Sequence, residues 1–316
     1  MRKNLFLMLC LLVAGTSTVK AQNAKIILHH NGTPTFFSSN ETQAALDASA
    51  DGDTLYFSEG NYSGGITISK KVVMIGYGDE KSVISGNVSV AIGAGGETLT
   101  KTLMEGLRVY DGTITIDKSI KGLIIRKCTF PTIQFKADVE EARIDRCRVL
   151  NTSYGIRLSN YVKGLVVNNS KIRYIEGDAP AAESAIFTNC NIRRESLNNT
   201  ATYMNCILSG LGSSQVATNT YINCLVRDGN NYISSAESHD CWKYDTNPVD
   251  DNMDCVLTDE QLLSVGYVGT DGKVIGINGG ETPYSLTTTA PKITEFSSAV
   301  DAETLKVTVN LKVSNK

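Results

Sequence analysis

A short segment recurs along the middle of the chain and constrains the fold more than any other feature. Each copy holds a stretch in which apolar residues alternate, then Asn or another polar residue, then a small anchor residue that is usually Cys. The anchors are Cys128, Cys147, Ser170, Cys190, Cys206, Cys224 and Cys241, and successive anchors lie 19, 23, 20, 16, 18 and 17 residues apart. A period of about 20 residues with two short alternating segments favours a solenoid of β coils over a helical array, because helical repeats need longer runs at 3.6-residue spacing.

Two pairs of positions in each copy predict where the core lies. The residues five and three before the anchor form one apolar pair, as in Leu123 and Ile125, and the anchor and the residue two after it form another, as in Cys190 and Ile192. Both pairs point inward, because side chains along a strand alternate between its faces. Between the pairs stand Asn169, Asn189, Asn205 and Asn223 in four copies. Asn tolerates a left-handed turn and can hydrogen-bond along a stack of its own kind.

Each copy therefore predicts a strand, an Asn corner and a second strand. We expect an all-β chain, a single-stranded right-handed parallel β-helix of roughly nine short coils, over residues 22–290. An open stack exposes strand edges at both ends, so each end needs a cover. Residues 39–48 predict a short capping helix with Asn40 and Gln43 at capping-box spacing. Residues 291–316 predict a C-terminal β-hairpin or the start of a small β-sandwich, because the last strand of this segment alternates strictly.

The first residues predict export. Arg2 and Lys3 precede an apolar run and a small polar stretch, the layout of a secretory signal, which we place at residues 1–21. The run is shorter than the ~20 residues of a membrane-spanning helix, and no later segment is long and apolar enough to be a transmembrane segment. We expect a periplasmic, cell-surface or extracellular location. A net charge of −3 without a basic block gives no support for a nucleic-acid partner.

The cysteines are expected to be structural. Coils in a stack are about 4.8 Å apart, and parallel Cβ vectors at that spacing lie beyond the separation that disulfides prefer. We predict that Cys190, Cys206, Cys224 and Cys241 stack as reduced thiols, which behave as small hydrophobic groups. No pair has the close spacing of a structural zinc site, so we assign no metal ligand among them.

The residue after each anchor is expected to face outward. This column contains Thr129, Arg148, Lys171 and Asn191, followed by the apolar residues Ile207, Leu225 and Trp242. A soluble monomer seldom exposes a large apolar patch. We therefore expect the tail, residues 291–316, to fold over the last three, with the rival possibility that the patch binds a partner.

Residues 42–86 resemble the pectin-lyase-like β-helix superfamily. The resemblance rests on the helix followed by Gly52-Asp53-Thr54, Gly60-Asn61-Tyr62, Ile66-Thr67-Ile68 and Ile75-Gly76, and the Asn-Cys copies resemble the coil of that superfamily. It implies the fold but no particular activity, because the superfamily includes lyases, hydrolases, esterases, adhesins and inert surface proteins.

The enzyme motifs of that superfamily do not carry over. Pectin methylesterases have Gln-Asp and Asp-x-Ile-Phe-Gly segments with no counterpart here, and the chain lacks the Gly-His-Gly and Arg-Ile-Lys of polygalacturonases although it has Asp250-Asp251. We assign no catalytic residue, no cofactor and no metal ligand. Calcium at an acidic loop is the one cofactor that we consider, since lyase chemistry would need it. The loop contains four carboxylates, those of Asp245, Asp250, Asp251 and Asp254. Because these residues lack the ordered spacing of calcium ligands, we favour a solvated loop without a bound ion.

Basic residues on adjacent copies form the only candidate site, a carbohydrate-binding stripe. Its members are Arg146, Arg148, Lys171, Arg173 and Arg193, with Arg194 beside them. Arg and Lys can hold the carboxylates of an acidic glycan. The alternative is a ladder of surface salt bridges with nearby acids: Glu140, Glu141, Asp145, Glu176, Asp178 and Glu183. We expect a non-catalytic protein that associates with carbohydrate or another cell-surface component, or alternatively a divergent lyase or glycoside hydrolase acting on an acidic polysaccharide.

Overall fold

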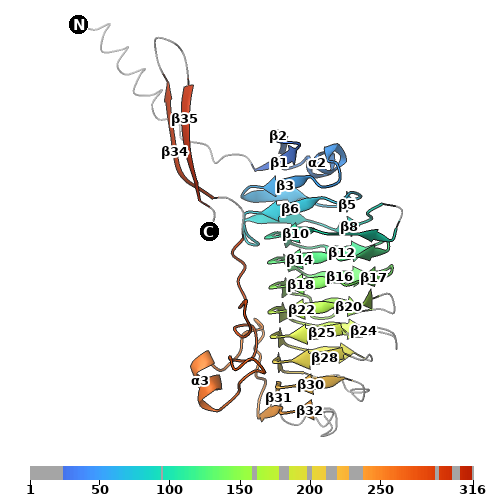
Figure 1. The fold of residues 1–316 in the computed structure, drawn as a ribbon, viewed down its shortest axis with the longest axis vertical. Helices are drawn as coiled ribbons and strands as arrows, with labels where there is room; N and C mark the ends of the chain where they lie inside the picture. Colours follow the sequence, from blue (N-terminus) through green and yellow to red (C-terminus); the bar gives the residue numbers. More distant parts are fainter. Residues whose placement is uncertain are drawn as a thin grey trace, which may run out of the picture.

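The computed structural model is a parallel β-helix, as the repeat predicts. It describes residues 24–93, 95–158, 162–177, 185–197, 201–210, 219–227, 238–288, 292–300 and 307–314. The expected signal segment, residues 1–21, lies outside the described residues. Figure 1 shows the coils stacked in one column from β3 to β32. The column has about eight turns, close to the roughly nine coils that the repeat predicts.

Four sheets run along the column, and each coil adds a strand to most of them. Sheet A has 12 strands in the order β2 (Thr33–Ser38), β1 (Lys25–His30), β3 (Thr54–Phe57), β6 (Val73–Gly76), β10 (Met104–Glu105), β14 (Ile124–Arg126), β18 (Arg143–Asp145), β22 (Val166–Asn168), β25 (Ala185–Thr188), β28 (Ala201–Met204), β30 (Thr220–Ile222) and β32 (Ser238–His239). From β3 onward all of its neighbours are parallel, whereas β1 pairs antiparallel with β2 and β3.

Sheets B and C continue each coil. Sheet B has ten strands, β4 (Gly60–Ser63), β7 (Ser82–Ser85), β11 (Arg108–Val109), β15 (Thr129–Phe130), β19 (Arg148–Val149), β23 (Lys171–Ile172), β26 (Asn191–Ile192), β29 (Ile207–Leu208), β31 (Leu225–Arg227) and β33 (Trp242–Tyr244). Sheet C has seven, β5 (Ile66–Ile68), β8 (Val88–Val90), β12 (Thr113–Ile116), β16 (Thr132–Phe135), β20 (Ile156–Leu158), β24 (Ile175–Gly177) and β27 (Glu195–Leu197). Sheet D has four, β9 (Glu97–Thr98), β13 (Ile120–Lys121), β17 (Val139–Glu140) and β21 (Val162–Lys163).

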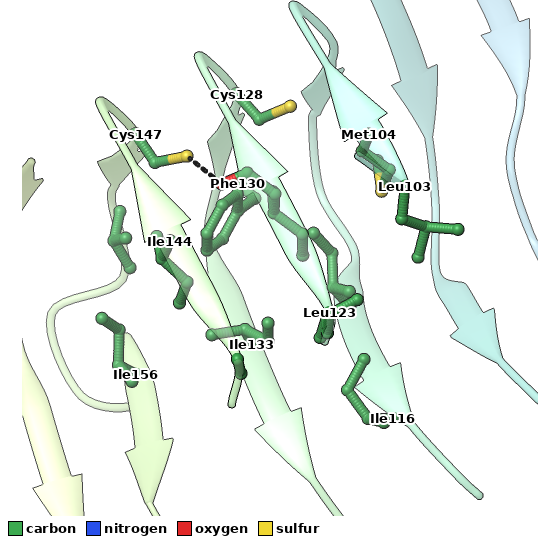
Figure 2. Packing of buried hydrophobic residues seen from close by; sticks show 14 of the residues in the cluster. Leu103, Met104, Ile116, Leu123, Cys128, Phe130, Ile133, Ile144, Cys147 and Ile156 are labelled. Carbon is green, nitrogen blue, oxygen red and sulfur yellow. Dashed lines mark hydrogen bonds between the residues drawn. The ribbon is translucent and has the colours of Figure 1, made fainter. Parts of the chain in front are cut away.

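The inward pairs of the repeat form the core, which confirms the predicted alternation. Leu123, Ile125, Cys190 and Ile192 are all buried. Figure 2 shows equivalent residues stacked from coil to coil, with Cys128 and Cys147 at matching places on adjacent coils. Burial raises the pKa of the Cys128 thiol to about 12, so this group stays neutral. All seven cysteines of the described part are free thiols, as predicted for the stacked set.

The corners between sheets A and B have the left-handed backbone that Asn was expected to supply. Their φ angles are 43° at Asn169, 53° at Asn189, 55° at Asn205 and 48° at Asn223. The prediction that the Asn side chains hydrogen-bond along their own stack was wrong. Three of the four bind a distant segment instead: Asn169 Nδ2 donates to the carbonyls of Ile277 (3.0 Å) and Gly279 (2.8 Å), and Asn205 and Asn223 bond Thr270 and Val268 of the same segment.

That segment, residues 249–288, is called the C-terminal strap below. The coils end at β33, and the strap runs back along the column toward its N-terminal end, past α3 (Asp259–Ser264) (Figure 1). It is held by buried polar contacts such as the reciprocal bonds between Ser209 and Val249, 2.7 and 2.8 Å. The last part of the predicted 22–290 solenoid is therefore strap and not coil.

The strap, and not the tail, covers the apolar patch. Ile207 and Leu225 are buried against strap residues that include Val249 and Ile275, and the Trp242 ring lies 5.1 Å from that of Tyr267. Our expectation that residues 291–316 cover this patch was wrong. The strap reaches it first because it follows the last coil directly. The tail does form the predicted antiparallel hairpin, in which β34 (Lys292–Val300) pairs with β35 (Val307–Ser314). The structure describes the backbone of this hairpin only.

The N-terminal helix exists, but its predicted cap does not. Helix α2 (Thr42–Ala48) packs Ala45 and Leu46 into the core at the top of the column (Figure 1). Its N-cap is Glu41, without a side-chain cap bond, and not Asn40. Gln43 instead pairs with the main chain of Thr67 on β5, where its Oε1 accepts the N–H at 2.8 Å. Tying the helix to the first coil replaces the expected local cap. Neither α2 nor α3 could span a membrane, and the described residues hold no other helix.

Candidate functional site

The predicted basic stripe lies on the outer side of sheet B and along its border with sheet C. Arg148 of β19 pairs in register with Lys171 of β23. Arg173 and Arg193 follow β23 and β26 and are neighbours in the same way, since Arg193 N–H donates to the carbonyl of Ile172 at 2.9 Å. Arg146 lies apart at the corner between sheets A and B, with φ at 52°. The structure therefore brings together four of the five residues and separates the fifth.

The stripe is paired chiefly with acids of the strap and only in part with the acids close in sequence. Lys171 Nζ bonds Asp254, and Arg193 Nε lies 3.3 Å from an oxygen of Asp251. Arg146 pairs with the adjacent Asp145 at 2.6 Å.

Of the other acids of the expected salt-bridge ladder, two pair outside the stripe, two lie outside the described residues, and Glu140 has no ion pair among the described residues. Glu141 contacts Lys121 and Glu176 contacts Arg157, each outside the stripe. Asp178 and Glu183 lie outside the described residues. Among the described acids of the expected ladder, only Asp145 forms an ion pair with a residue of the stripe.

Aromatic residues extend the stripe where sheet B turns into sheet C. Tyr154 is 51% exposed, and the guanidinium of Arg157 lies 4.9 Å from the centre of its ring. On the next coil, the Tyr174 ring is 5.4 Å from the guanidinium of Arg194, which belongs to the coil after it. We call the set Tyr154, Arg157, Arg173, Tyr174, Arg193 and Arg194 the Tyr–Arg corner.

The Tyr–Arg corner combines two kinds of contact that a sugar acid needs. Tyr rings offer flat apolar faces with a polar tip, and guanidinium groups bind carboxylates in a fork. Among the described residues, two carboxylates form ion pairs with its four arginines, those of Glu176 and Asp251, so the described part of the corner has an excess of positive charge. The sequence pointed to Arg173 and Arg193 but missed Tyr154 and Tyr174, which fall in irregular corner segments where the repeat gives no register.

Three of the four aspartates of the acidic loop have partners within the protein. Asp250 Oδ1 accepts the N–H groups of Asn252 (2.8 Å) and Asp254 (2.9 Å), while Asp251 and Asp254 face Arg193 and Lys171. Among the described residues, no three His, Cys, Asp or Glu side chains converge as metal ligands. This loop is organised by its own main chain and by the basic stripe.

A buried carboxylate lies at the N-terminal end of the same face. Asp79 is 6% exposed and accepts a hydrogen bond from Thr129 Oγ1 at 2.6 Å. Burial raises its pKa above the ordinary value, although Arg108 and Arg148 pull in the opposite direction. Burial also raises the pKa of Tyr284 in the strap, and the negative charge of Asp79 raises it further. Because Asp79 is buried and interacts electrostatically with Tyr284, we interpret it as part of the surface on which the strap docks.

Comparisons of the chain with known protein families, with characterised proteins and with solved structures found no match.

Proposed function

We propose that the protein is exported and binds an acidic polysaccharide without catalysis, through the Tyr–Arg corner. The observation that carries the proposal is the exposed Tyr154 ring with three adjacent coils of guanidinium groups beside it. Tyr and Arg are, together with Trp, the residue types enriched at the energetic hot spots of protein interfaces. Coils repeat at about 4.8 Å, so groups on successive coils can contact successive units of an extended polymer.

The proposed site differs from the basic stripe expected from the sequence, because it leaves out Lys171 and includes Arg194. Lys171 is covered by the strap, with its ammonium bonded to Asp254 and 5.2 Å from the Tyr284 ring. Arg173 has no ion pair among the described residues, and Arg194 is exposed. These two arginines are the ones best placed to contact a carboxylate outside the protein.

We also infer a relation to the pectin-lyase-like superfamily. It is supported by the capping helix α2 ahead of the first parallel strands and by the left-handed Asn corners. A divergent lyase or hydrolase remains the alternative function, and it would release unsaturated or reducing ends from the bound polymer.

Affinity electrophoresis of the mature protein in gels containing polygalacturonate or alginate tests the proposal, with dextran as the neutral polymer. Retardation should occur with the acidic polymers and weaken as salt is raised, because exposed charges are screened. Arg173→Ala and Arg194→Ala should each weaken binding by roughly two- to fivefold, the worth of one exposed ion pair.

Arg143→Ala is the matched control, since Arg143 is exposed on sheet A and away from the corner. Equal loss in Arg143→Ala and Arg173→Ala would mean that net charge and not the corner binds the polymer. No retardation by any acidic polymer would refute the proposal, and release of sugar ends during incubation would replace it with the enzymatic alternative.

A further inference from the structure

An open pocket of about 500 Å³ lies between the strap and the outer side of sheet B. Its floor is aliphatic: Ile207 of β29 meets Leu262 and Ile275 of the strap, and each is 1% exposed. Leu257 and Ile277 complete this apolar wall. None of the residues of the Tyr–Arg corner lines the pocket, so it is separate from the proposed glycan surface.

The rim of the pocket is acidic. Asp254, Asp259 and Glu260 line it, and no Lys or Arg does. Asp254 is bonded from outside by Lys171, which leaves two of the three negative charges without a cationic partner among the described residues. Asp259 is held in place by Asn278, whose Nδ2 lies 3.0 and 3.1 Å from its two oxygens. One carboxylate is thus fixed at the mouth of an apolar hollow.

Cys255 also lines the pocket, and its pKa reflects both burial and the acidic rim. Burial raises its pKa, and the negative charges of Asp259, Asp250 and Asp254 raise it further. The three carboxylates therefore disfavour an anion in this wall, while burial disfavours a charge of either sign away from the rim.

The shape and the charge together select a class of ligand. A metal ion would need several converging ligands, and the described residues contain no such set. An aliphatic floor instead suits methylene groups, while the acidic rim suits one ammonium group. We propose that this pocket binds a short-chain primary alkylamine, with its stem against Ile207, Leu262 and Ile275 and its ammonium between Asp259 and Glu260.

A chain-length series tests the proposal on the intact mature protein. Calorimetric titration with methylamine through n-pentylamine should show affinity rising by up to roughly fourfold for each buried CH₂. n-Pentanol should bind more weakly than n-pentylamine, and n-pentanoate should not bind. Raising the salt concentration should weaken the amine and leave the alcohol unchanged.

Glu260→Gln should weaken n-pentylamine binding by roughly two- to fivefold, since it removes one exposed charge. Glu281→Gln, an equal charge change at an exposed strap residue outside the pocket, should leave it unchanged. As a measurement on the unaltered chain, n-pentylamine should slow alkylation of Cys255 by iodoacetamide and leave the rate at Cys241 unaffected. Both thiols are partly accessible, so Cys241 serves as an internal reference.

Equal affinity for n-pentylamine and n-pentanol would overturn the proposal, as would an affinity independent of chain length or an equal effect of the two Gln variants. These outcomes do not depend on glycan binding. Failure here and failure of the Tyr–Arg corner are therefore distinguishable.

Discussion

Replacing Asn205 by Ala and by Gly separates the two roles of an Asn corner. Asn205 is 3% exposed and has a left-handed backbone, with φ at 55°. Its side chain also holds the strap: Oδ1 accepts the N–H of Thr270 at 3.0 Å, and Nδ2 donates to Thr270 Oγ1 at 3.2 Å. Both variants lose these bonds, but only Ala is strained by the backbone.

The expected losses of stability follow from those contacts. Two hydrogen bonds are worth about 2 kcal/mol at ~1 kcal/mol each, so Asn205→Gly should be destabilised by roughly that amount. Asn205→Ala should lose a further ~1–2 kcal/mol, the cost of a left-handed conformation for a residue with a Cβ. Asn168→Ala is the control, because Asn168 is a strand residue of β22 without a left-handed backbone.

Urea unfolding followed by two signals measures these differences. Trp242 is the single tryptophan and lies beside Tyr267 of the strap, so its emission reports strap docking, while far-UV circular dichroism reports the coils. Asn205→Gly should shift the Trp242 transition more than the dichroism transition. Equal stability of the Ala and Gly variants would refute the backbone argument, and a Gly variant as stable as the parent would refute the role of the strap contacts.

Three further predictions concern thiols, pH and the strap acids. Five of the seven thiols of the described part are buried, so in a chain produced from Gln22 onward a disulfide reagent at mildly alkaline pH should label only Cys241 and Cys255 in the folded state, both slowly because their pKa values are raised, and all seven after denaturation; fewer than seven would indicate disulfides. The raised pKa of Asp79 means that the folded state holds its proton more tightly, so this group lowers stability as the pH rises above the ordinary Asp value of about 3.9. Asp79→Asn keeps an acceptor for Thr129, so it should raise Tm at neutral pH, where Asp79 is forced toward its charged form, and have little effect near pH 3, about one unit below the ordinary Asp pKa. The same gain in Tm at both pH values would contradict the titration argument. Asp251→Asn should raise affinity for an acidic polysaccharide, because it releases Arg193 of the Tyr–Arg corner, whereas Asp254→Asn should not, because its partner Lys171 is covered by the strap; an equal effect of the two variants in affinity gels would show that the corner is not the binding surface.

The sequence by itself determined the coil. The inward pairs, the left-handed Asn corners and the free thiols all follow from a repeat of about 20 residues, because each coil of a solenoid contacts mainly its neighbours and local periodicity therefore decides its geometry. The hairpin at residues 291–316 was equally predictable from strict alternation.

Only the tertiary structure decided what covers the coils and where a ligand could bind. The strap has no regular period, and its contacts join residues far apart in the chain: Asn169 to Gly279 across 110 positions, and Arg193 to Asp251 across 58. Such pairings depend on the path that the chain takes after the last coil, which local patterns do not encode. For the same reason the strap, and not the tail, buries the apolar patch, while Tyr154 and Tyr174 meet the arginines only because the corners of successive coils lie one above another.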